Sequence, residues 1–397
     1  MARAFRYAVV GAGALGSAAA YWLSRRAGED VACLEQFEPG HGLGASEDHS
    51  RIIRLGYHSP AYTALTRDAY DAWRTVEEEA GVALVHTTGM VNVARGGTEG
   101  AAILDAYVAA MERHGIEHER VGAPELMRRH PQFRVPEDHE ALLQPDGGIL
   151  DIRRAVAAQL ALARARGATV LPRTRVTALE ERDGEVELAT PGGAVRAERV
   201  VVCAGAWTSR LLRGMGVDWP IALTEEQVTY FATPHLDEFA VGRFPIWIWH
   251  GEDDFYGFPV YGERATKAAV ERLGPAIELE ERRAQPDPER VRQVREFVDA
   301  VLPGFGGPEL YSRTCLYDMP PDRDFVVDLL PGHRGIAVAI GAGHAAKFAS
   351  LLGRILAELA VDGATAAPIG PFRADRPALA DPGFRAGYRL GGAAVAH

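Results

Sequence analysis

The chain has 397 residues, of which 47% are hydrophobic and 24% charged, and its formal net charge is −11. This length and apolar content predict a protein with a large core and two domains, and the acidic balance excludes the basic surface that nucleic-acid binding needs. Three cysteines without a CxxC pair predict a reducing compartment and no metal site, and we expect a cytoplasmic protein without a leader or a membrane segment.

The N-terminal segment begins with a short apolar strand, residues 5–10, and continues into an alanine-rich helix over residues 14–27. Between them Gly11, Gly13 and Gly16 fill the pattern G-x-G-x-x-G. The first glycine permits the tight turn, the second lets the backbone approach a pyrophosphate, and the third allows close helix packing. The segment therefore predicts a unit that binds a dinucleotide.

A second strand, residues 30–34, ends at Glu35, where a carboxylate would meet the ribose hydroxyls of an adenine dinucleotide. An acidic residue here favours NAD or FAD over NADP, but the pattern does not separate the first two. Farther along, Arg51 and Arg54 are three residues apart, which predicts one side of a helix or turn. One of them could face the cofactor and the other a substrate carboxylate, although two surface arginines remain the alternative.

Among the 43 lysine and arginine residues, only Lys267 and Lys347 are lysines. A lysine offers a compact charge that can shift its pKa or solvate a small anion, which favours a specific role for both; ordinary surface positions are the alternative. Lys347 follows a predicted strand over 335–340 and a glycine-rich turn, and it lies on a predicted helix. A similar strand begins at Val200 and leads into a helix that carries Trp207. Nucleotide-binding elements thus recur along the chain, which implies a discontinuous domain.

The intervening segments carry aromatic, alternating stretches that predict an antiparallel sheet and one helix over 288–301. The predicted fold class is α/β with an α+β second domain. The cofactor-binding domain takes residues 1–84, 149–223 and 321–385, the substrate domain takes 85–148 and 224–320, and 386–397 form a tail. One residue does not fit this division: Cys315 lies among aromatic, proline and acidic residues, which predict neither a strand core nor a disulfide.

With these segments together, the chain resembles the amine-oxidising flavoproteins of the monomeric sarcosine oxidase and N-methyltryptophan oxidase family, in the D-amino-acid-oxidase superfamily. The markers are "GAGALGSAAAYWL" with Glu35, "SRIIR", "YGFPVYG" followed by Lys267, "CLYDMPPDRDFVVD" and "GAGHAAKF". They cover essentially the whole chain. The resemblance implies a Rossmann-like FAD-binding domain and a discontinuous substrate domain built on an antiparallel sheet.

The resemblance also assigns roles to single residues. Cys315 is implied to carry FAD through a thioether, with a reduced core cysteine and noncovalent FAD as the alternative. Lys267 is implied to accelerate the reaction of reduced flavin with O₂, and Arg51 to lie near the flavin on the same side. Arg54 and Lys347 are implied to bind the substrate carboxylate.

Tyr256 and Tyr317 are implied to lie near the substrate and His344 near the flavin, with core packing or a structural hydrogen bond as the alternatives. The full set of expected cofactor contacts is Gly11, Gly13, Ala14, Leu15, Gly16, Glu35, Ser46, Arg51, Val176, Ala204, Gly205, Trp207, Cys315, Gly341, Gly343, His344 and Lys347.

The implied reaction is oxidative demethylation of sarcosine by a monomeric enzyme, with O₂ and water, to glycine, formaldehyde and hydrogen peroxide. Glu47 and Glu271 depart from the sarcosine-specific pattern, which has histidines there, so N-methyltryptophan, pipecolate or proline, and fructosyl amino acids remain alternative substrates. Either carboxylate could admit a larger or cationic amine, or form an ion pair with an arginine. An NAD-dependent dehydrogenase, an electron-transfer flavoprotein subunit and a noncatalytic flavin-binding module are the other classes left open.

Overall fold

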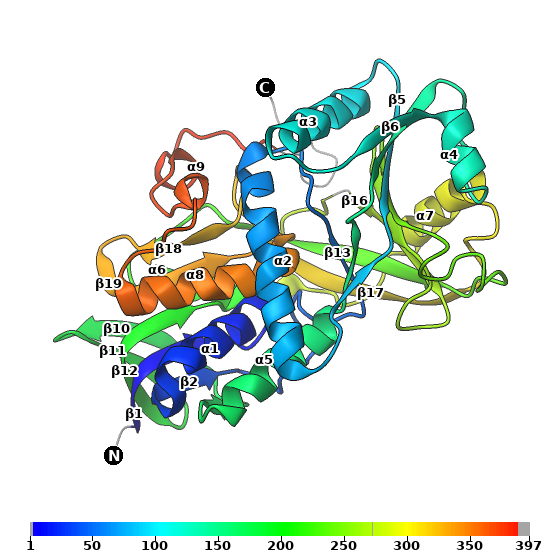
Figure 1. The fold of residues 1–397 in the computed structure, drawn as a ribbon. Coiled ribbons are helices and arrows are strands. Elements are labelled where there is room, and N and C mark those ends of the chain that lie inside the picture. The colour runs from blue at the N-terminus through cyan, green and yellow to red at the C-terminus, as the bar shows by residue number, and fades with distance from the viewer. Residues whose placement is uncertain (1–2, 272, 388–397) are drawn as a thin grey trace.

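The computed structural model describes residues 3–271 and 273–387, and its strands are divided between two large sheets and a small one (Figure 1). In the first large sheet the strands follow the order β10 (Ala178–Arg182), β11 (Glu185–Thr190), β12 (Gly193–Val202), β1 (Arg3–Val10), β2 (Val31–Leu34) and β9 (Thr169–Leu171). The end of β12 also pairs with β19 (His333–Ile340), beside which lies β18 (Val326–Leu330).

Three helices pack against this first sheet: α1 (Ala14–Ala27), α5 (Ile152–Ala165) and α8 (Ala349–Asp362) (Figure 1). Helix α1 also packs against the other two helices. The alternation of side chains along β1 explains why both sheet faces are covered. Val9 is buried in the cluster that contains the helix side chains, whereas Ala8 and Val10 are buried in a cluster on the opposite face. The prediction of a buried strand over residues 5–10 holds for Tyr7 to Val10, which form the continuous apolar run of a strand covered on both faces, whereas Arg6 is exposed.

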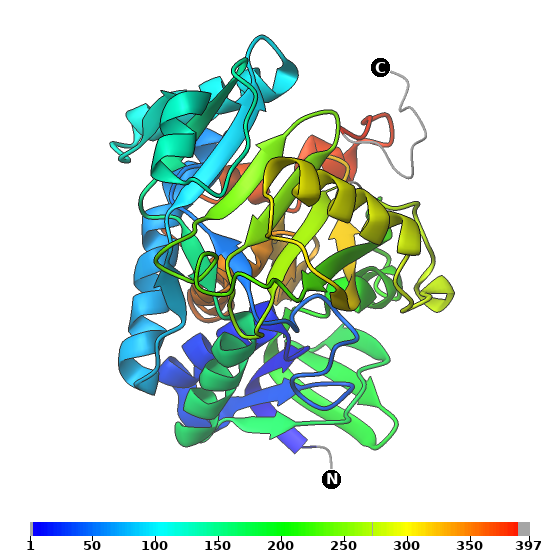
Figure 2. The ribbon, with the colours of Figure 1, turned by 90° about the vertical axis from the view of Figure 1, so that its right-hand side faces the viewer.

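The second large sheet follows the order β17 (Glu309–Met319), β13 (Ala222–Phe231), β16 (Thr266–Glu271), β15 (Asp254–Phe258), β14 (Ile246–His250), β5 (Met90–Arg95), β7 (His139–Gln144) and β6 (Glu119–Gly122). The prediction of an antiparallel sheet holds except at one place, because β14 and β5 run parallel. Helix α7 (Pro288–Val301) lies across this sheet (Figure 2). Its Phe297 stacks on Phe255 with ring centroids 3.9 Å apart.

The small sheet joins β3 (Arg51–Ile53), β8 (Gly148–Leu150) and β4 (Val85–Thr87). The prediction of a helix or turn at Arg51 and Arg54 was therefore wrong: Arg51 begins a strand and Arg54 follows its end. Helix α2 (Pro60–Ala80) packs against α5 and α8 at the first sheet and against α3 (Glu99–Arg113) near the second. The remaining helices are α4 (Ala123–Arg129), α6 (Thr208–Arg213) and α9 (Pro377–Ala380).

Two further expectations differ from the structure. Cys315 lies in the middle of the long strand β17, although its surroundings predicted no strand. Trp207 and Lys347 lie in short 3₁₀ turns, Gly205–Trp207 and Ala345–Phe348, which precede α6 and α8. Most of the tail, residues 388–397, lies outside the described residues, and the domain bounds stay a prediction. Within the part of the chain that the structure describes, no helix is both long and apolar enough to cross a membrane.

Candidate active site

A cavity of about 950 Å³ is lined by residues of both large sheets and of the loop that precedes β3. Of the expected cofactor contacts, only Gly16 does not line it. The residues on its wall are Gly11, Gly13, Ala14, Leu15, Glu35, Ser46, Arg51, Val176, Ala204, Gly205, Trp207, Cys315, Gly341, Gly343, His344 and Lys347. Arg54, Tyr256, Lys267 and Tyr317 line the same cavity. The structure thus brings together side chains from positions 11 to 347.

The glycine-rich turn forms part of the cavity wall. Gly11 has φ +96°, and a Cβ there would lie 2.4 Å from the carbonyl oxygen of Cys203. A Cβ at Gly16 would lie 1.9 Å from the carbonyl oxygen of Gly11, so Gly16 packs helix against turn, as predicted. Helix α1 begins after Gly13 without a side-chain cap. The turn therefore leaves a helix N-terminus facing the cavity, where an anionic group is stabilised.

Glu35 and Ser46 complete this part of the wall. Glu35 Oε2 accepts a hydrogen bond from the backbone N–H of Ala12 (2.7 Å), and His41 Nε2 lies 3.3 Å from its other oxygen. Burial raises the pKa of Glu35, but the hydrogen bonds from His41 and from the backbone outweigh burial and hold it below its usual value. Ser46 Oγ accepts from the backbone N–H of Ala14 (2.8 Å). A buried, charged carboxylate beside the glycine turn is the arrangement that binds ribose hydroxyls.

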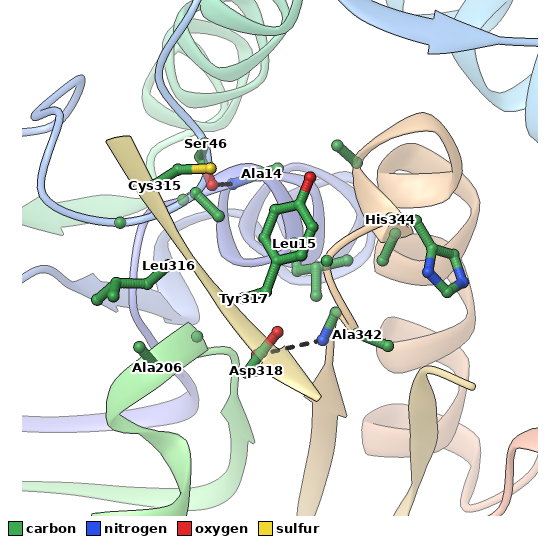
Figure 3. A pocket seen from close by; sticks show the side chains of 18 of the residues that line it. Ala14, Leu15, Ser46, Ala206, Cys315, Leu316, Tyr317, Asp318, Ala342 and His344 are labelled. Atoms are coloured by element: carbon green, nitrogen blue, oxygen red, sulfur yellow. Dashed lines mark hydrogen bonds between the residues drawn. The ribbon is translucent and has the colours of Figure 1, made fainter. Parts of the chain in front are cut away.

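Cys315 and Tyr317 point to the same side of β17, as expected for residues two apart on a strand (Figure 3). Burial raises the pKa of the Cys315 thiol to about 11, although Arg51 opposes the shift. Tyr317 lies against Gly343, where a Cβ would come within 2.3 Å of the tyrosine ring. Gly343 also has φ +72°, so both the backbone conformation and the ring require glycine.

Lys267 lies on β16 and is 3% exposed. Its Nζ donates to Asp48 Oδ2 (2.5 Å) and to the carbonyl oxygen and Oγ of Ser50 (3.0 and 3.1 Å). Burial lowers the pKa of Lys267 to about 8, and the Asp48 carboxylate limits that shift. Arg51 Nη1 also donates to Asp48 Oδ2 (3.2 Å). The expected pair of Lys267 and Arg51 therefore shares one buried carboxylate.

Arg54 and Lys347 face a different part of the cavity. The Arg54 guanidinium lies 4.4 Å from the centroid of the Tyr57 ring, and Lys347 Nζ lies 5.7 Å from the same centroid. Burial and then the charge of Arg54 lower the pKa of Lys347 to about 7. Among the described residues, neither cation has a carboxylate within ion-pair distance. From a longer distance, the charge of Glu271 favours the charged form of both cations. Two cations that lack a paired carboxylate among the described residues form a site in this cavity for an anionic group such as a carboxylate.

His344 makes the structural hydrogen bond that was its alternative role. Its Nε2 lies 2.9 Å from the hydroxyl oxygen of Tyr62. Burial and then the charge of Lys347 lower the pKa of His344 well below its usual value, so the ring is neutral. Tyr256 lies on β15 and packs with Phe258, their ring centroids 6.1 Å apart. Both residues nevertheless line the cavity, and their roles toward a ligand stay a prediction.

Glu47 and Glu271, the two residues that depart from the sarcosine-specific pattern, form ion pairs with arginines. An ion pair with an arginine was one of the two predicted roles for these carboxylates. Glu47 pairs with Arg153 and Arg313, and Glu271 accepts from Arg323 Nη2 (2.9 Å). Both carboxylates line the cavity.

Sequence reasoning missed two buried acids of the cavity wall, Asp48 and Asp318. Burial raises the pKa of Asp318 to about 6, although backbone N–H groups of the turn at Gly341 oppose the shift. Asp318 points away from the side of β17 that carries Tyr317 (Figure 3). No signal in the sequence distinguishes Asp48 from its neighbour Glu47, because two of the partners of Asp48, Lys267 and Tyr230, come from distant strands.

Comparison with known proteins decides the family. Residues 6–359 match the model of the family described as FAD dependent oxidoreductase. The chain belongs to that family. It is 32% identical over 384 residues to a monomeric sarcosine oxidase from Bacillus sp. (strain NS-129), a match that covers 96% of this chain and 98% of the relative. It is also 32% identical to an N-methyl-L-tryptophan oxidase from Escherichia coli O9:H4 (strain HS), over 93% of this chain and 98% of the relative.

The solved structures agree with the FAD-dependent oxidoreductase fold. NikD, an unusual amino acid oxidase essential for nikkomycin biosynthesis, superposes with a TM-score of 0.82 at 27% identity, over the full length of both chains. An L-proline dehydrogenase from P. horikoshii has the same fold, with a TM-score of 0.83 at 20% identity, over 94% of this chain and 97% of the other. Membership of the family decides between FAD and NAD, which the glycine pattern left open, in favour of FAD. The glycine turn, the N-terminus of α1 and Glu35 fit the pyrophosphate and ribose of FAD.

Proposed function

We propose that the chain is a monomeric oxidase of secondary amino acids, with sarcosine as the first choice of substrate and with FAD attached through a thioether to Cys315. The observation that carries the proposal is the pair of cations Arg54 and Lys347, which lie over one tyrosine ring without a carboxylate partner among the described residues. They share a cavity with Cys315 and Lys267. The near-full-length likeness to sarcosine and N-methyltryptophan oxidases supports the substrate class.

FAD, when bound, supplies the acceptor for two electrons from the amine and passes them to O₂, so that sarcosine, O₂ and water give glycine, formaldehyde and hydrogen peroxide. The residues of the chain bind and orient the substrate. The planar Arg54 fork and the Lys347 ammonium hold the carboxylate, and Tyr256 and Tyr317 limit the space around the amine. The positive charge of Arg54 and Lys347 also lowers the pKa of the bound amine, so the amine loses its proton without a strong base.

Lys267 acts on the oxygen half of the reaction in this proposal. Reduction of O₂ places negative charge on oxygen, and a fixed cation nearby stabilises that charge. Lys267 and Arg51 are both held beside Cys315, the proposed attachment point of the flavin. Lys267 is buried, so water screens its charge weakly.

The test is a spectrum of the purified protein before and after acid precipitation, followed by anaerobic addition of sarcosine. A yellow pellet and bleaching of the flavin are the expected results. Arg54→Ala is the matched variant, because it should keep the yellow pellet and lose bleaching at low sarcosine concentrations. A colourless pellet contradicts the thioether. A yellow pellet that no sarcosine concentration bleaches contradicts sarcosine and directs the search to N-methyltryptophan, pipecolate, proline and fructosyl amino acids.

A further inference from the structure

Four donors converge on the carboxylate of Asp48, which is 3% exposed. Oδ2 accepts from Lys267 Nζ (2.5 Å) and from Arg51 Nη1 (3.2 Å). Oδ1 accepts from the hydroxyl of Tyr230 and from the backbone N–H of His49 (2.7 Å). A buried carboxylate with this many donors stays ionised, because each hydrogen bond favours its charged form. Lys267 and Arg51 hold the pKa of Asp48 well below its usual range against the effect of burial.

The Lys267 ammonium is held equally firmly. Its three N–H groups have three protein acceptors, Asp48 Oδ2 and the two oxygens of Ser50. The ring centroids of Phe258 and Tyr230 lie 4.5 and 5.7 Å from Nζ. Asp48 is the single carboxylate that hydrogen-bonds this ammonium in the described parts of the chain. Lys267 therefore presents a fixed positive charge to the cavity, with its donors already used by Asp48 and Ser50.

We propose that Asp48 is the positioning residue of Lys267: it holds the ammonium in place, keeps it charged, and so sets the pH range in which the reduced enzyme reacts with O₂. This inference rests on the function proposed above for Lys267 in the oxygen reaction. The hydrogen bonds between Asp48, Lys267 and Ser50 do not depend on that function, so the pairing and the oxygen role are tested separately.

The sign of the expected pH effect follows from the groups that face Lys267. Burial and, to a smaller extent, the charge of Arg51 lower its pKa to about 8 against the opposing charge of Asp48. Cys315 carries no charge in the holoenzyme when it is the proposed thioether. Farther from Lys267, the Tyr230 hydroxyl donates a hydrogen bond to Asp48. Tyr311 stacks on Tyr230, and its hydroxyl donates a hydrogen bond to Glu263. The ammonium charge is present below the pKa and is lost as the pH rises through it. Replacing Asp48 by a neutral residue removes the main interaction that favours the charge, so the charge is lost at lower pH.

The scarcity of lysine makes Lys267 directly observable. Lysine labelled with ¹³C at Cε gives signals from Lys267 and Lys347 only, and Lys347→Arg assigns them by removing one. In the holoenzyme we expect Lys267 to titrate near pH 8, and in Asp48→Asn at least about one pH unit lower. Asp48→Glu, which keeps the negative charge, should return the Lys267 midpoint most of the way to the wild-type value. An unchanged or higher midpoint in Asp48→Asn overturns the proposal.

The oxygen half-reaction provides the second measurement. Enzyme reduced anaerobically is mixed with O₂ between pH 5.5 and 9.5, and flavin reoxidation is followed by stopped flow. We expect the wild-type rate to fall above about pH 8, and the Asp48→Asn rate to fall from the lower pH at which its Lys267 signal titrates. If the lysine midpoint moves and the oxygen rate does not follow it, the pairing stands, but the link to oxygen and the proposed role of Lys267 are both wrong.

Asp48→Asn leaves Lys267 and Arg51 buried with one counter-ion fewer, and it can fail to fold for that reason. The double variant Asp48→Asn/Lys267→Met removes both members of the pair, so it tests whether the unpaired ammonium is what destabilises Asp48→Asn. It should be more stable to urea than Asp48→Asn alone, because it no longer buries the unpaired ammonium. If the two substitutions destabilise additively, Asp48 and Lys267 are not coupled, and the proposal is overturned.

Discussion

Arg54 and Lys347 lie over the same aromatic ring, that of Tyr57, although they are 293 positions apart in the chain. Arg54 comes directly after β3, and Lys347 lies in the 3₁₀ turn before α8. The π-electrons of the ring attract both cations. The arrangement also has a cost, because burial and then the charge of Arg54 lower the pKa of Lys347, and an anionic ligand relieves that cost.

Arg54→Ala should raise the KM for sarcosine by about 10- to 100-fold, the size expected for a lost charge-assisted hydrogen bond to the substrate carboxylate. Steady-state oxygen consumption measures it. Arg74→Ala on the exposed face of α2 is the control, since it removes a guanidinium at the surface and should leave the KM unchanged. An unchanged KM in Arg54→Ala would rule out a direct contact with the carboxylate.

Binding of simple carboxylates should weaken as the pH rises through about 7. Burial lowers the pKa of Lys347 from its usual value to about 7, so its charge is present below that pH and lost above it. Propionate avoids the titration of a substrate amine, and its Kd is measured from the change in the flavin spectrum. Lys347→Arg keeps a cation at every pH tested and should flatten the profile. A wild-type Kd that is constant from pH 6 to 9 contradicts this assignment.

Cys315→Ala should fold and bind FAD, but acid precipitation should leave all the flavin in the supernatant. The residue lies in the middle of β17 and alanine keeps its Cβ, so the strand pairing with β13 is preserved. Cys203→Ala is the matched control, because Cys203 is a buried cysteine at the glycine turn. Flavin that remains in the pellet of Cys315→Ala would place the covalent bond elsewhere.

Lys267→Met should slow flavin reoxidation by O₂ far more than flavin reduction by the amine. Methionine keeps most of the stem between Phe258 and Tyr230 and removes the charge, which costs about 2 to 4 kcal/mol of stabilisation, or about 30- to 1000-fold in rate. Stopped-flow measurement of the two half-reactions separates the effects. Equal slowing of both would assign Lys267 to positioning of the ring rather than to oxygen.

Gly11→Ala should lower the melting temperature and FAD content more than Gly40→Ala does. Both glycines have positive φ, +96° and +87°, so both substitutions carry a backbone cost of about 1 kcal/mol. At Gly11 the new Cβ would also lie 2.4 Å from the carbonyl oxygen of Cys203, whereas no atom lies within 4 Å of a Cβ at Gly40. Equal losses in the two variants would show that close approach at the turn is unimportant.

The elements that local patterns determine could be predicted from the sequence. The strand, turn and helix around Gly11 were predicted correctly because apolar period, glycine spacing and helix propensity agree there. Arg51 and Cys315 were placed in the wrong kind of element because their strands are set by pairing with distant partners, β8 and β13. Asp48 could not be predicted as a partner of Lys267, since 219 positions separate them and only the fold brings them together.

The placement of the two lysines should make the folded protein resistant to proteases that cleave after lysine. Lys267 is buried in a sheet, and Lys347 is half-buried in a 3₁₀ turn on the cavity wall, so neither lysine stands on an exposed, extended segment. An endoprotease that cleaves only after lysine needs several residues of extended, accessible chain around its target. It should leave the folded protein intact and cut it once the chain opens, so the rate of lysine-specific digestion should measure how often the molecule unfolds.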